Sequence, residues 1–344
     1  MSDLRNGIIV VDDNSVIQYI DDIAKDILLL DNNCISKSIK DLIHDDDIIE
    51  LLDKSFSSRQ TEAKELRPGW DATKNLFIKV ESYQTSKESG FLILVTDLSN
   101  LRKLEGLQRE FVANVSHELR TPLTSIKMAS ESLQLGAISD DRMRSKFLSN
   151  IQREADRLTR LVNELLVIAN LDNKVTLHIS KFNPSELLSD VVTVMKYHAD
   201  LNDITLVDDF PEHLPLLEAD KDRLQQVLIN LTDNAIKCNR QNGKVTVYAR
   251  QDAKKLVIRV VDTGIGIHKV DIDRIFDRFF RVDKSRSRVT GGTGLGLSIV
   301  KDLIVAHGGT ISVESTVDVG TTFIIVLPFE SPVKEQNKEN PIKA

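Results

Sequence analysis

The feature that most limits what this chain can fold into is a pair of long apolar stripes at helical spacing. The first stripe recurs mostly at steps of three or four residues: Leu104, Leu107, Phe111, Val115, Leu119, Pro122, Ile126 and Leu133. The second stripe keeps that spacing: Phe147, Ile151, Ala155, Leu158, Val162, Leu165 and Ala169. Such spacing places each stripe on one face of a helix. We therefore predict a helical hairpin, whose second helix is capped at Ser139, Asp140 and Asp141.

A hairpin with an apolar stripe on each helix cannot bury both stripes by itself. The simplest closure is a second copy of the hairpin, which completes a four-helix bundle. We therefore expect a homodimer. Pro122 lies inside the first stripe and removes one backbone hydrogen bond, so the helix should bend or loosen there.

The segments on both sides of the hairpin have mixed α and β patterns. Residues 7–20 hold two β-rich runs around a polar turn, and further apolar runs follow at 76–80 and 91–96. After the hairpin we predict these elements: helices at 184–201, 220–238 and 296–307, and strands at 245–250, 255–262, 310–314 and 321–327. The fold class is thus multidomain α+β. Its predicted parts are residues 1–98 (small α+β domain), 99–173 (hairpin), 174–330 (α/β sandwich) and 331–344 (disordered tail).

Charge and cysteine content exclude several classes of function. The net charge is −7, and its acidic excess lies in residues 1–100, so basic and acidic groups nearly balance in the rest of the chain. That part lacks the basic excess of a nucleic-acid-binding protein, and we expect no nucleic-acid partner. Cys34 and Cys238 are too far apart for a zinc knuckle or a disulfide framework. There is no run of 18 apolar residues and no signal peptide, which predicts a soluble, cytoplasmic chain.

The first candidate site is one helix face that carries Gln226, Asn230, Asn234 and Lys237 within roughly 80°. Asparagine oxygens can bind a hard cation, and a lysine can pair with phosphate. A solvated helix face is the alternative interpretation.

Two further clusters lie where glycine is concentrated, since nine of the 15 glycines fall between Gly264 and Gly320. Asp262 ends an apolar strand just before Gly264 and Gly266, and a buried carboxylate there could accept from a purine amino group. The stretch 291–298 leads straight into a helix, which makes an anion site. It matches neither the Walker signature nor a dinucleotide fingerprint. A purely structural glycine loop remains the alternative.

These clusters, in this order and with Phe276–Arg281 between the last two, resemble the nucleotide boxes of the histidine kinase ATP-binding domain. The resemblance implies that the chain binds ATP and Mg²⁺, with Asn234 holding the metal and Asp262 meeting the adenine amino group. It places Gly292, Gly294 and Gly296 under the phosphates. The other nucleotide-binding residues that it implies are Asn230, Lys237, Gly264, Gly266, Arg281, Leu295 and Leu297. Residues of about 277–293 would form a mobile lid, although the charges there could also be solvated loop charges.

The predicted hairpin carries a second motif of the same family. Phe111–Thr124 closely resembles the phospho-acceptor motif of sensor histidine kinases of the PhoR and WalK type. From the residues themselves, His117 is offset by roughly 160° from the apolar stripe, so it should be exposed. A neutral imidazole can attack a γ-phosphate. The resemblance implies that Glu118 accepts the other ring proton, and that Thr121 orients a water for dephosphorylation of the partner.

The N-terminal part is similar to PAS sensor domains, by its Gly7–Asp12 opening and its Asp41–Asp47 segment. The segment Val95–Ser99 then resembles the start of the helix that couples such a domain to a kinase. Kinases of this layout usually carry membrane helices before the PAS domain. We therefore expect the cytoplasmic part of a membrane-anchored sensor, whose anchor would precede residue 1.

The leading hypothesis is ATP-dependent autophosphorylation on His117, followed by phosphoryl transfer to an aspartate of a response regulator receiver domain, with phosphatase activity toward that regulator. A non-catalytic, ATP-binding dimeric scaffold is the alternative, but it should lack His117, Asn234 or the glycine-rich loop, and all are present. A chaperone-type or repair-type ATPase would lack the hairpin. The sequence leaves open the stimulus, the regulator, the native start, and whether phosphorylation occurs within or across protomers.

Overall fold

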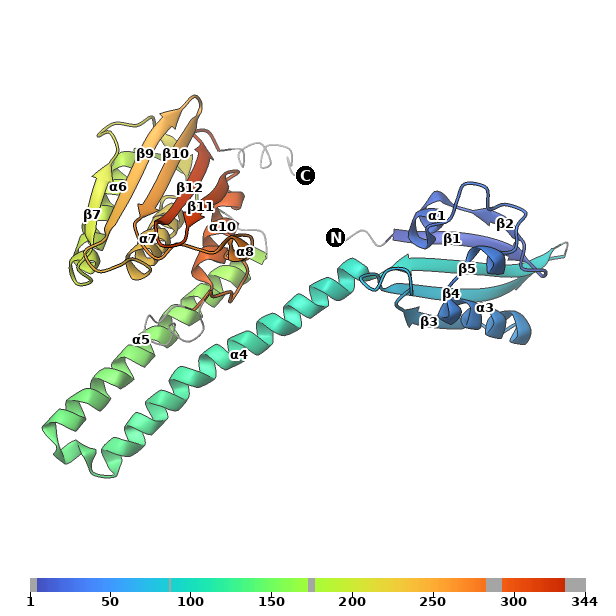
Figure 1. Cartoon of the computed structure of the whole chain (residues 1–344), viewed down its shortest axis with the longest axis horizontal. Coiled ribbons are helices and arrows are strands. Elements are labelled where there is room, and N and C mark those ends of the chain that lie inside the picture. Colours follow the sequence, from blue (N-terminus) through green and yellow to red (C-terminus); the bar gives the residue numbers. More distant parts are fainter. Residues whose placement is uncertain (1–4, 87, 173–176, 283–292, 332–344) are drawn as a thin grey trace, which may run out of the picture. The chain divides into compact units, whose positions relative to one another are not determined.

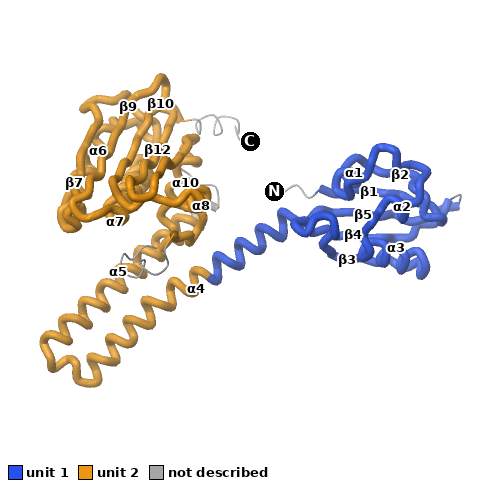
Figure 2. Tube along the Cα trace, in the orientation of Figure 1, with its two compact units in different colours: residues 1–113 blue, residues 114–344 orange. Residues whose placement is uncertain are grey.

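The computed structural model describes residues 5–86, 88–172, 177–282 and 293–331. The chain divides into two compact units, Met1–Ala113 and Asn114–Ala344, which are described separately below (Figure 2). The division falls inside one long helix, α4 (Ser99–Gln134). Among the described residues, no helix combines the length and the apolar character needed to cross a membrane.

The first unit is built on one antiparallel sheet in the order β2-β1-β5-β4-β3. Its strands are β1 (Arg5–Asp12), β2 (Ile17–Ile20), β3 (Glu62–Leu66), β4 (Leu76–Gln84) and β5 (Ser89–Asp97). Its helices are α1 (Asp22–Leu28), α2 (Ile39–Leu42) and α3 (Asp46–Ser58) (Figure 1). The predicted hairpin is confirmed, because Ile9 pairs with Ile20. β3 was not predicted, because it is short, charged and mostly exposed, as suits an edge strand.

The predicted helical hairpin is confirmed by α4 and α5 (Asp141–Asp172), joined through a short 3₁₀ turn, η1 (Ala137–Ser139). Asp140 caps α5 as expected, since its Oδ1 accepts the amides of Arg142 at 2.9 Å and Met143 at 3.1 Å. α4 continues through Pro122 without a break. In the single chain two residues of the α4 stripe are exposed, Leu104 (55%) and Leu107 (54%), whereas Pro122 is buried and the other stripe residues are half-buried.

The rest of the second unit is an α/β sandwich whose sheet runs β11-β12-β10-β9-β7, antiparallel except for the parallel pair β7 and β9. Its strands are β7 (Thr205–Asp209), β9 (Lys244–Asp252), β10 (Lys255–Asp262), β11 (Thr310–Thr316) and β12 (Gly320–Pro328). Helices α6 (Pro184–Asp200), α7 (Lys221–Lys237) and α10 (Gly296–Ala306) pack on the sheet (Figure 1). Smaller elements are β6 (Ser180–Phe182), β8 (Leu217–Ala219) and α8 (Lys269–Ile272).

The predicted elements of this sandwich are confirmed within a few residues. Its core includes the inward-facing, alternate side chains of β9 and β10, such as Val247 and Ile258, which are each 1% exposed. Strands β6, β7 and β8 were not predicted, because they are short and carry few apolar residues. Ser331 belongs to the folded part, since its amide donates to Glu218 Oε2 at 3.2 Å. The remainder of the predicted tail lies outside the described residues.

Candidate functional site

Helix α7 presents a polar face above the sandwich core. Asp220 begins the helix, because its Oδ1 accepts the amide of Arg223 at 3.1 Å. The opposite face is buried and apolar: Leu224, Val227, Leu228, Leu231 and Ala235. Asn230, Asn234 and Lys237 are half-buried on the polar face, as the helical spacing predicted.

The donors and acceptors of this face suit a phosphorylated ligand with a divalent cation. The side-chain nitrogen of Asn230 is buried and has no hydrogen-bond partner among the described residues. Buried donors are almost always paired, so this one suits an acceptor from a ligand. Within the described parts of the chain, Asn234 Oδ1 receives only the Cys238 thiol, at 3.7 Å, and an amide oxygen of this kind suits Mg²⁺. The Lys237 ammonium is paired with Asp233, so its charge is not fully available.

Asp262 is a buried acceptor at the end of β10, with 6% of its surface exposed. Its Oδ1 accepts the amides of Gly264 at 2.8 Å and Thr321 at 3.1 Å. Burial raises the pKa of this carboxyl, and the two backbone hydrogen bonds oppose the rise. Oδ2 accepts no hydrogen bond from the described residues, so it is available to an amino group. Gly264 is required here, because a Cβ would lie 2.3 Å from the Cys238 carbonyl oxygen.

The glycine-rich loop enters α10 in a conformation suited to an anion. Gly292 and the preceding lid residues 283–291 lie outside the described residues, whereas Gly294, Leu295, Gly296 and Leu297 are described. Leu295 precedes the helix, and no side chain caps the first turn. The amides of that turn have no partner within the helix, so they can receive phosphate oxygens. Gly266, after β10, has a φ of +70° that only glycine adopts readily.

Two alanine substitutions should separate loop architecture from phosphate access. Gly294 has a φ of +78°, and a Cβ there would lie 2.9 Å from the Phe279 backbone, whose amide donates to the Gly294 carbonyl. Gly294→Ala should therefore cost about 1–3 kcal/mol of stability as well as ATP affinity. At Gly296 a Cβ would meet nothing closer than 3.9 Å, so Gly296→Ala should weaken ATP binding at unchanged stability. Thermal melts measure the stability of both variants, and titrations measure their affinity for ATP. Equal melting temperatures of the two variants would contradict the structural role of Gly294.

The phospho-acceptor segment lies on α4 in the same unit. His117 is exposed, as predicted, and its neighbour Glu118 is half-buried toward α5. Arg157 on α5 donates from Nη2 to Glu118 Oε2 at 2.9 Å. The Thr121 hydroxyl donates to the His117 carbonyl at 3.2 Å, which leaves its lone pairs available to water. Arg157 was not singled out from the sequence, because only the packing of the two helices shows its partner.

The helical hairpin contacts the nucleotide-binding part directly. α5 packs on α10, and the Thr293 hydroxyl donates to the Glu164 carboxylate on α5. Arg281 precedes the described part of the glycine-rich loop, and the charges of Glu118 and Arg157 both influence its pKa. Burial lowers the pKa of Arg281, Glu118 opposes this and Arg157 reinforces it. Arg281, a basic residue of the predicted lid, therefore lies within electrostatic reach of the phospho-acceptor segment.

The contact at Glu164 should depend on pH. Burial raises the pKa of this carboxyl, while the Thr293 hydrogen bond and the charges of Arg160 and Lys237 oppose the rise. A raised carboxyl pKa means that the folded state favours the neutral form, so stability is lost as the pH rises through the raised value. Glu164→Gln is neutral at every pH and still accepts from Thr293. We expect it to melt about 2–4 °C above the wild type at pH 8.

That difference in melting temperature should close toward pH 4, where Glu164 is protonated in the wild type as well. Circular dichroism melts of both chains between pH 4 and 8 measure it. A constant difference across this range would show that the effect of the substitution is unrelated to ionisation.

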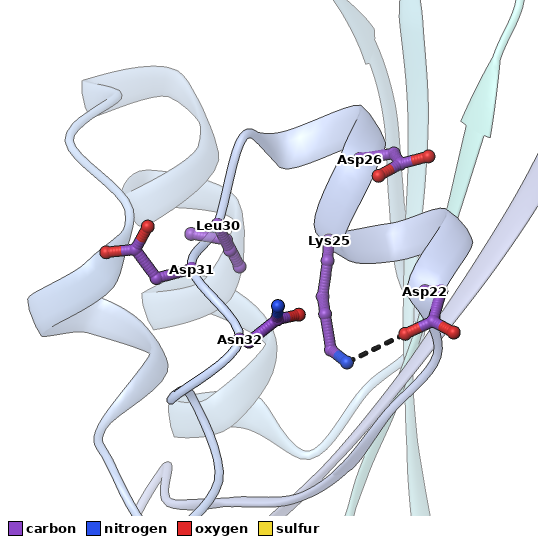
Figure 3. Close-up of a pocket in the computed structure, with 6 residues that line it drawn as sticks. All are labelled: Asp22, Lys25, Asp26, Leu30, Asp31 and Asn32. Atoms are coloured by element: carbon purple, nitrogen blue, oxygen red, sulfur yellow. Dashed lines mark hydrogen bonds and ion pairs between the residues drawn. The ribbon is translucent and has the colours of Figure 1, made fainter.

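The first unit contains a polar hollow beside α1, lined by Asp22, Lys25, Asp26, Leu30, Asp31 and Asn32 (Figure 3). Lys25 Nζ donates to Asp22 Oδ1 at 2.8 Å within it. The hollow shares no residue with the predicted nucleotide or phospho-acceptor sites. Its open, charged lining identifies no particular ligand.

Two family models match the chain. The His Kinase A phospho-acceptor domain matches residues 107–174, and the histidine kinase-, DNA gyrase B- and HSP90-like ATPase matches residues 219–331. These ranges contain His117 on one side and Asn234, Asp262 and Gly294 on the other. Each match therefore coincides with one of the two sites described above.

The chain is also similar to curated sensor kinases. The sensor protein kinase WalK of Staphylococcus saprophyticus is 40% identical over 252 residues, which is 72% of this chain and 41% of the relative. A WalK sequence of Staphylococcus aureus is 38% identical over 252 residues, with 60% of the relative covered. The chain thus spans about two fifths to three fifths of the length of these relatives.

Solved structures share the fold. The structure of the histidine kinase ThkA in complex with the response regulator protein TrrA aligns with 94% of this chain, over 96% of the matched chain, with a TM-score of 0.54 and 24% identity. The Acinetobacter baumannii histidine kinase AdeS covers 62% of this chain and 98% of its own, with a TM-score of 0.51 and 24% identity. At these identities the likeness concerns the fold alone.

Proposed function

This chain belongs to the sensor protein-histidine kinases, and we propose that it transfers the γ-phosphoryl group of ATP to His117 and then to an aspartate of a response regulator receiver domain. The observation that carries the proposal is the packing of α10 on α5, where Thr293 at the glycine-rich loop donates to Glu164. It joins the nucleotide-binding part to the hairpin that bears the exposed His117. The ThkA structure, solved with a response regulator, supports the choice of partner.

The phosphoryl transfer needs a nucleophile, a proton acceptor and charge neutralisation. One ring nitrogen of His117 attacks the γ-phosphorus, the bond from that phosphorus to the ADP oxygen breaks, and ADP leaves. The proton on the other ring nitrogen passes to the Glu118 carboxylate. Arg281 stabilises the charge on the transferring group. In the second step the N–P bond breaks as a receiver-domain carboxylate oxygen bonds to phosphorus, and the proton held by Glu118 returns to the ring, which regenerates the neutral imidazole.

The nucleotide site supplies binding and orientation. Asp262 Oδ2 accepts the adenine amino group, and the amides of Gly294, Gly296 and Leu297 receive the phosphates. Asn234 would hold Mg²⁺, with Asn230 beside the phosphates, and the bound metal would neutralise phosphate charge. Lys237 contributes less to phosphate binding than an unpaired lysine would, because Asp233 partly neutralises its charge.

A phosphatase activity toward the regulator follows from the position of Thr121. Its exposed hydroxyl lies one turn after His117 and is fixed by the hydrogen bond to the His117 carbonyl. The lone pairs of that oxygen can accept from a water and orient it toward an acyl phosphate.

We further propose that the first unit is a PAS sensor domain and that two chains form a four-helix bundle. The sheet order β2-β1-β5-β4-β3, with helices between β2 and β3, supports the first proposal. The exposed stripe residues on α4, together with Val162 (46%) and Leu166 (57%) on α5, support the second. In a single chain these apolar side chains are exposed to water, and the hairpin of a second chain would cover them.

Labelling with [γ-³²P]ATP and Mg²⁺ tests the kinase against the scaffold alternative. A phosphohistidine is labile in acid and stable in alkali, so the expected label has both properties. Purified receiver domains, added afterwards, should remove it. A chain that binds ATP yet acquires no label under varied salt and pH would favour the non-catalytic scaffold instead.

A further inference from the structure

The residue that holds the proposed proton acceptor comes from the other helix of the hairpin. Arg157 Nη2 lies 2.9 Å from Glu118 Oε2, and the side chains are 12% and 31% exposed. The hydrogen bond uses one carboxylate oxygen and one guanidinium nitrogen. Oε1 therefore accepts no hydrogen bond from the described residues.

The arrangement has the logic of a catalytic triad, in which a nucleophile meets an acceptor that a third group orients. His117 is the nucleophile, Glu118 the acceptor and Arg157 the third group. The His117 ring is exposed and makes no hydrogen bond within the described residues. The proposed mechanism requires this ring to turn toward Oε1 while Arg157 keeps Oε2. A half-buried, charge-assisted pair of this kind restrains the carboxylate more strongly than a solvated one.

We infer that Arg157 is a positioning residue for autophosphorylation: it holds the Glu118 carboxylate beside His117 with one oxygen open. This inference rests on the proposed function, because it names a further residue of the same site. Arg157 touches neither ATP nor the imidazole, and it acts through Glu118.

Kinetics of Arg157→Ala test the inference. We expect kcat for autophosphorylation to fall about tenfold while the KM for ATP stays unchanged. This fall is smaller than the full rate enhancement that a general base contributes, because Glu118 itself is retained. Arg157→Lys, which keeps the charge, should restore part of the rate. A rate equal to or above that of the wild type would overturn the inference.

A double-mutant cycle separates positioning from mere support of the hairpin. In the Glu118→Gln background, Arg157→Ala should cause little further loss, because its target carboxylate is gone. An equal loss in both backgrounds would mean that Arg157 acts on the helices rather than on Glu118. Arg153→Ala is the matched control, since Arg153 lies one turn earlier on α5, is 69% exposed and bonds to Asn150. It should leave the rate unchanged.

A readout without ATP distinguishes failure of this inference from failure of the proposed function. Carbethoxylation by diethyl pyrocarbonate at pH 8, where imidazole is neutral, reports the reactivity of each histidine by peptide mass spectrometry. Arg157→Ala should slow the reaction at His117 several-fold and leave the exposed His198 unchanged. Identical His117 rates would refute the role of Arg157, whether or not the wild type phosphorylates itself.

Discussion

Replacing His117 by glutamine is expected to abolish the acid-labile label while ATP binding and folding are retained. The side chain is exposed and makes no hydrogen bond within the described residues, so its loss should change stability by less than about 0.5 kcal/mol. The amide nitrogen of glutamine is not nucleophilic. We therefore expect labelling to fall by roughly 10³-fold or more. Autoradiography, with acid and alkali treatment, measures this directly.

A residual acid-labile label on the His117→Gln chain would contradict the assignment, because another histidine would then accept the phosphoryl group. Mixing this variant with Asn234→Ala answers a second question. If the two variants exchange protomers and the label returns, phosphorylation crosses the dimer. If mixed dimers stay unlabelled, each nucleotide site serves the histidine of its own chain.

Asp262→Asn should weaken ATP binding by about 100-fold without changing the fold. Asparagine keeps an oxygen for the amides of Gly264 and Thr321, so the local backbone remains paired. It places an NH₂ group where the adenine amino group needs an acceptor, and two donors then face each other. A site built to bind a substrate N–H loses heavily when its partner is lost. Isothermal titration calorimetry with ATP measures the change.

The matched control is Asp209→Asn, which removes an equal charge from an exposed carboxylate on β7 that pairs with Arg250. It should bind ATP like the wild type. A dissociation constant within twofold of the wild type for Asp262→Asn would show that Asp262 does not contact the base.

The parts of the fold that were predicted from the sequence are those whose periodicity spans many residues. α4 and α5 carry their stripes over several turns, and β9, β10 and β12 alternate over seven or more residues. The strands that were missed have too few apolar residues for a period to appear. β3, for example, reads Glu-Ala-Lys-Glu-Leu and is held by pairing with β4 rather than by its own burial.

The same distinction applies to the candidate site. Asn230, Asn234 and Asp262 could be predicted because each lies at a fixed offset within one element or one turn. Arg157 and Glu164 could not, because their partners Glu118 and Thr293 are 39 and 129 residues away in sequence. Such pairs depend on the register of α4 against α5 and on the packing of α5 on α10. Neither is encoded in a local pattern.

Because α4 is one continuous helix, the number of residues between its start and His117 sets the angle about the helix axis between them. From Ser99 to His117 the helix advances 18 residues, which is about five complete turns and roughly 27 Å. Adding or removing one residue in this interval would rotate the preceding residues of α4 by about 100° about the helix axis relative to His117, whereas a change of seven residues would leave an offset of only about 20°. Each position along this helix is therefore also an angular position, which insertions or deletions of about seven residues would preserve.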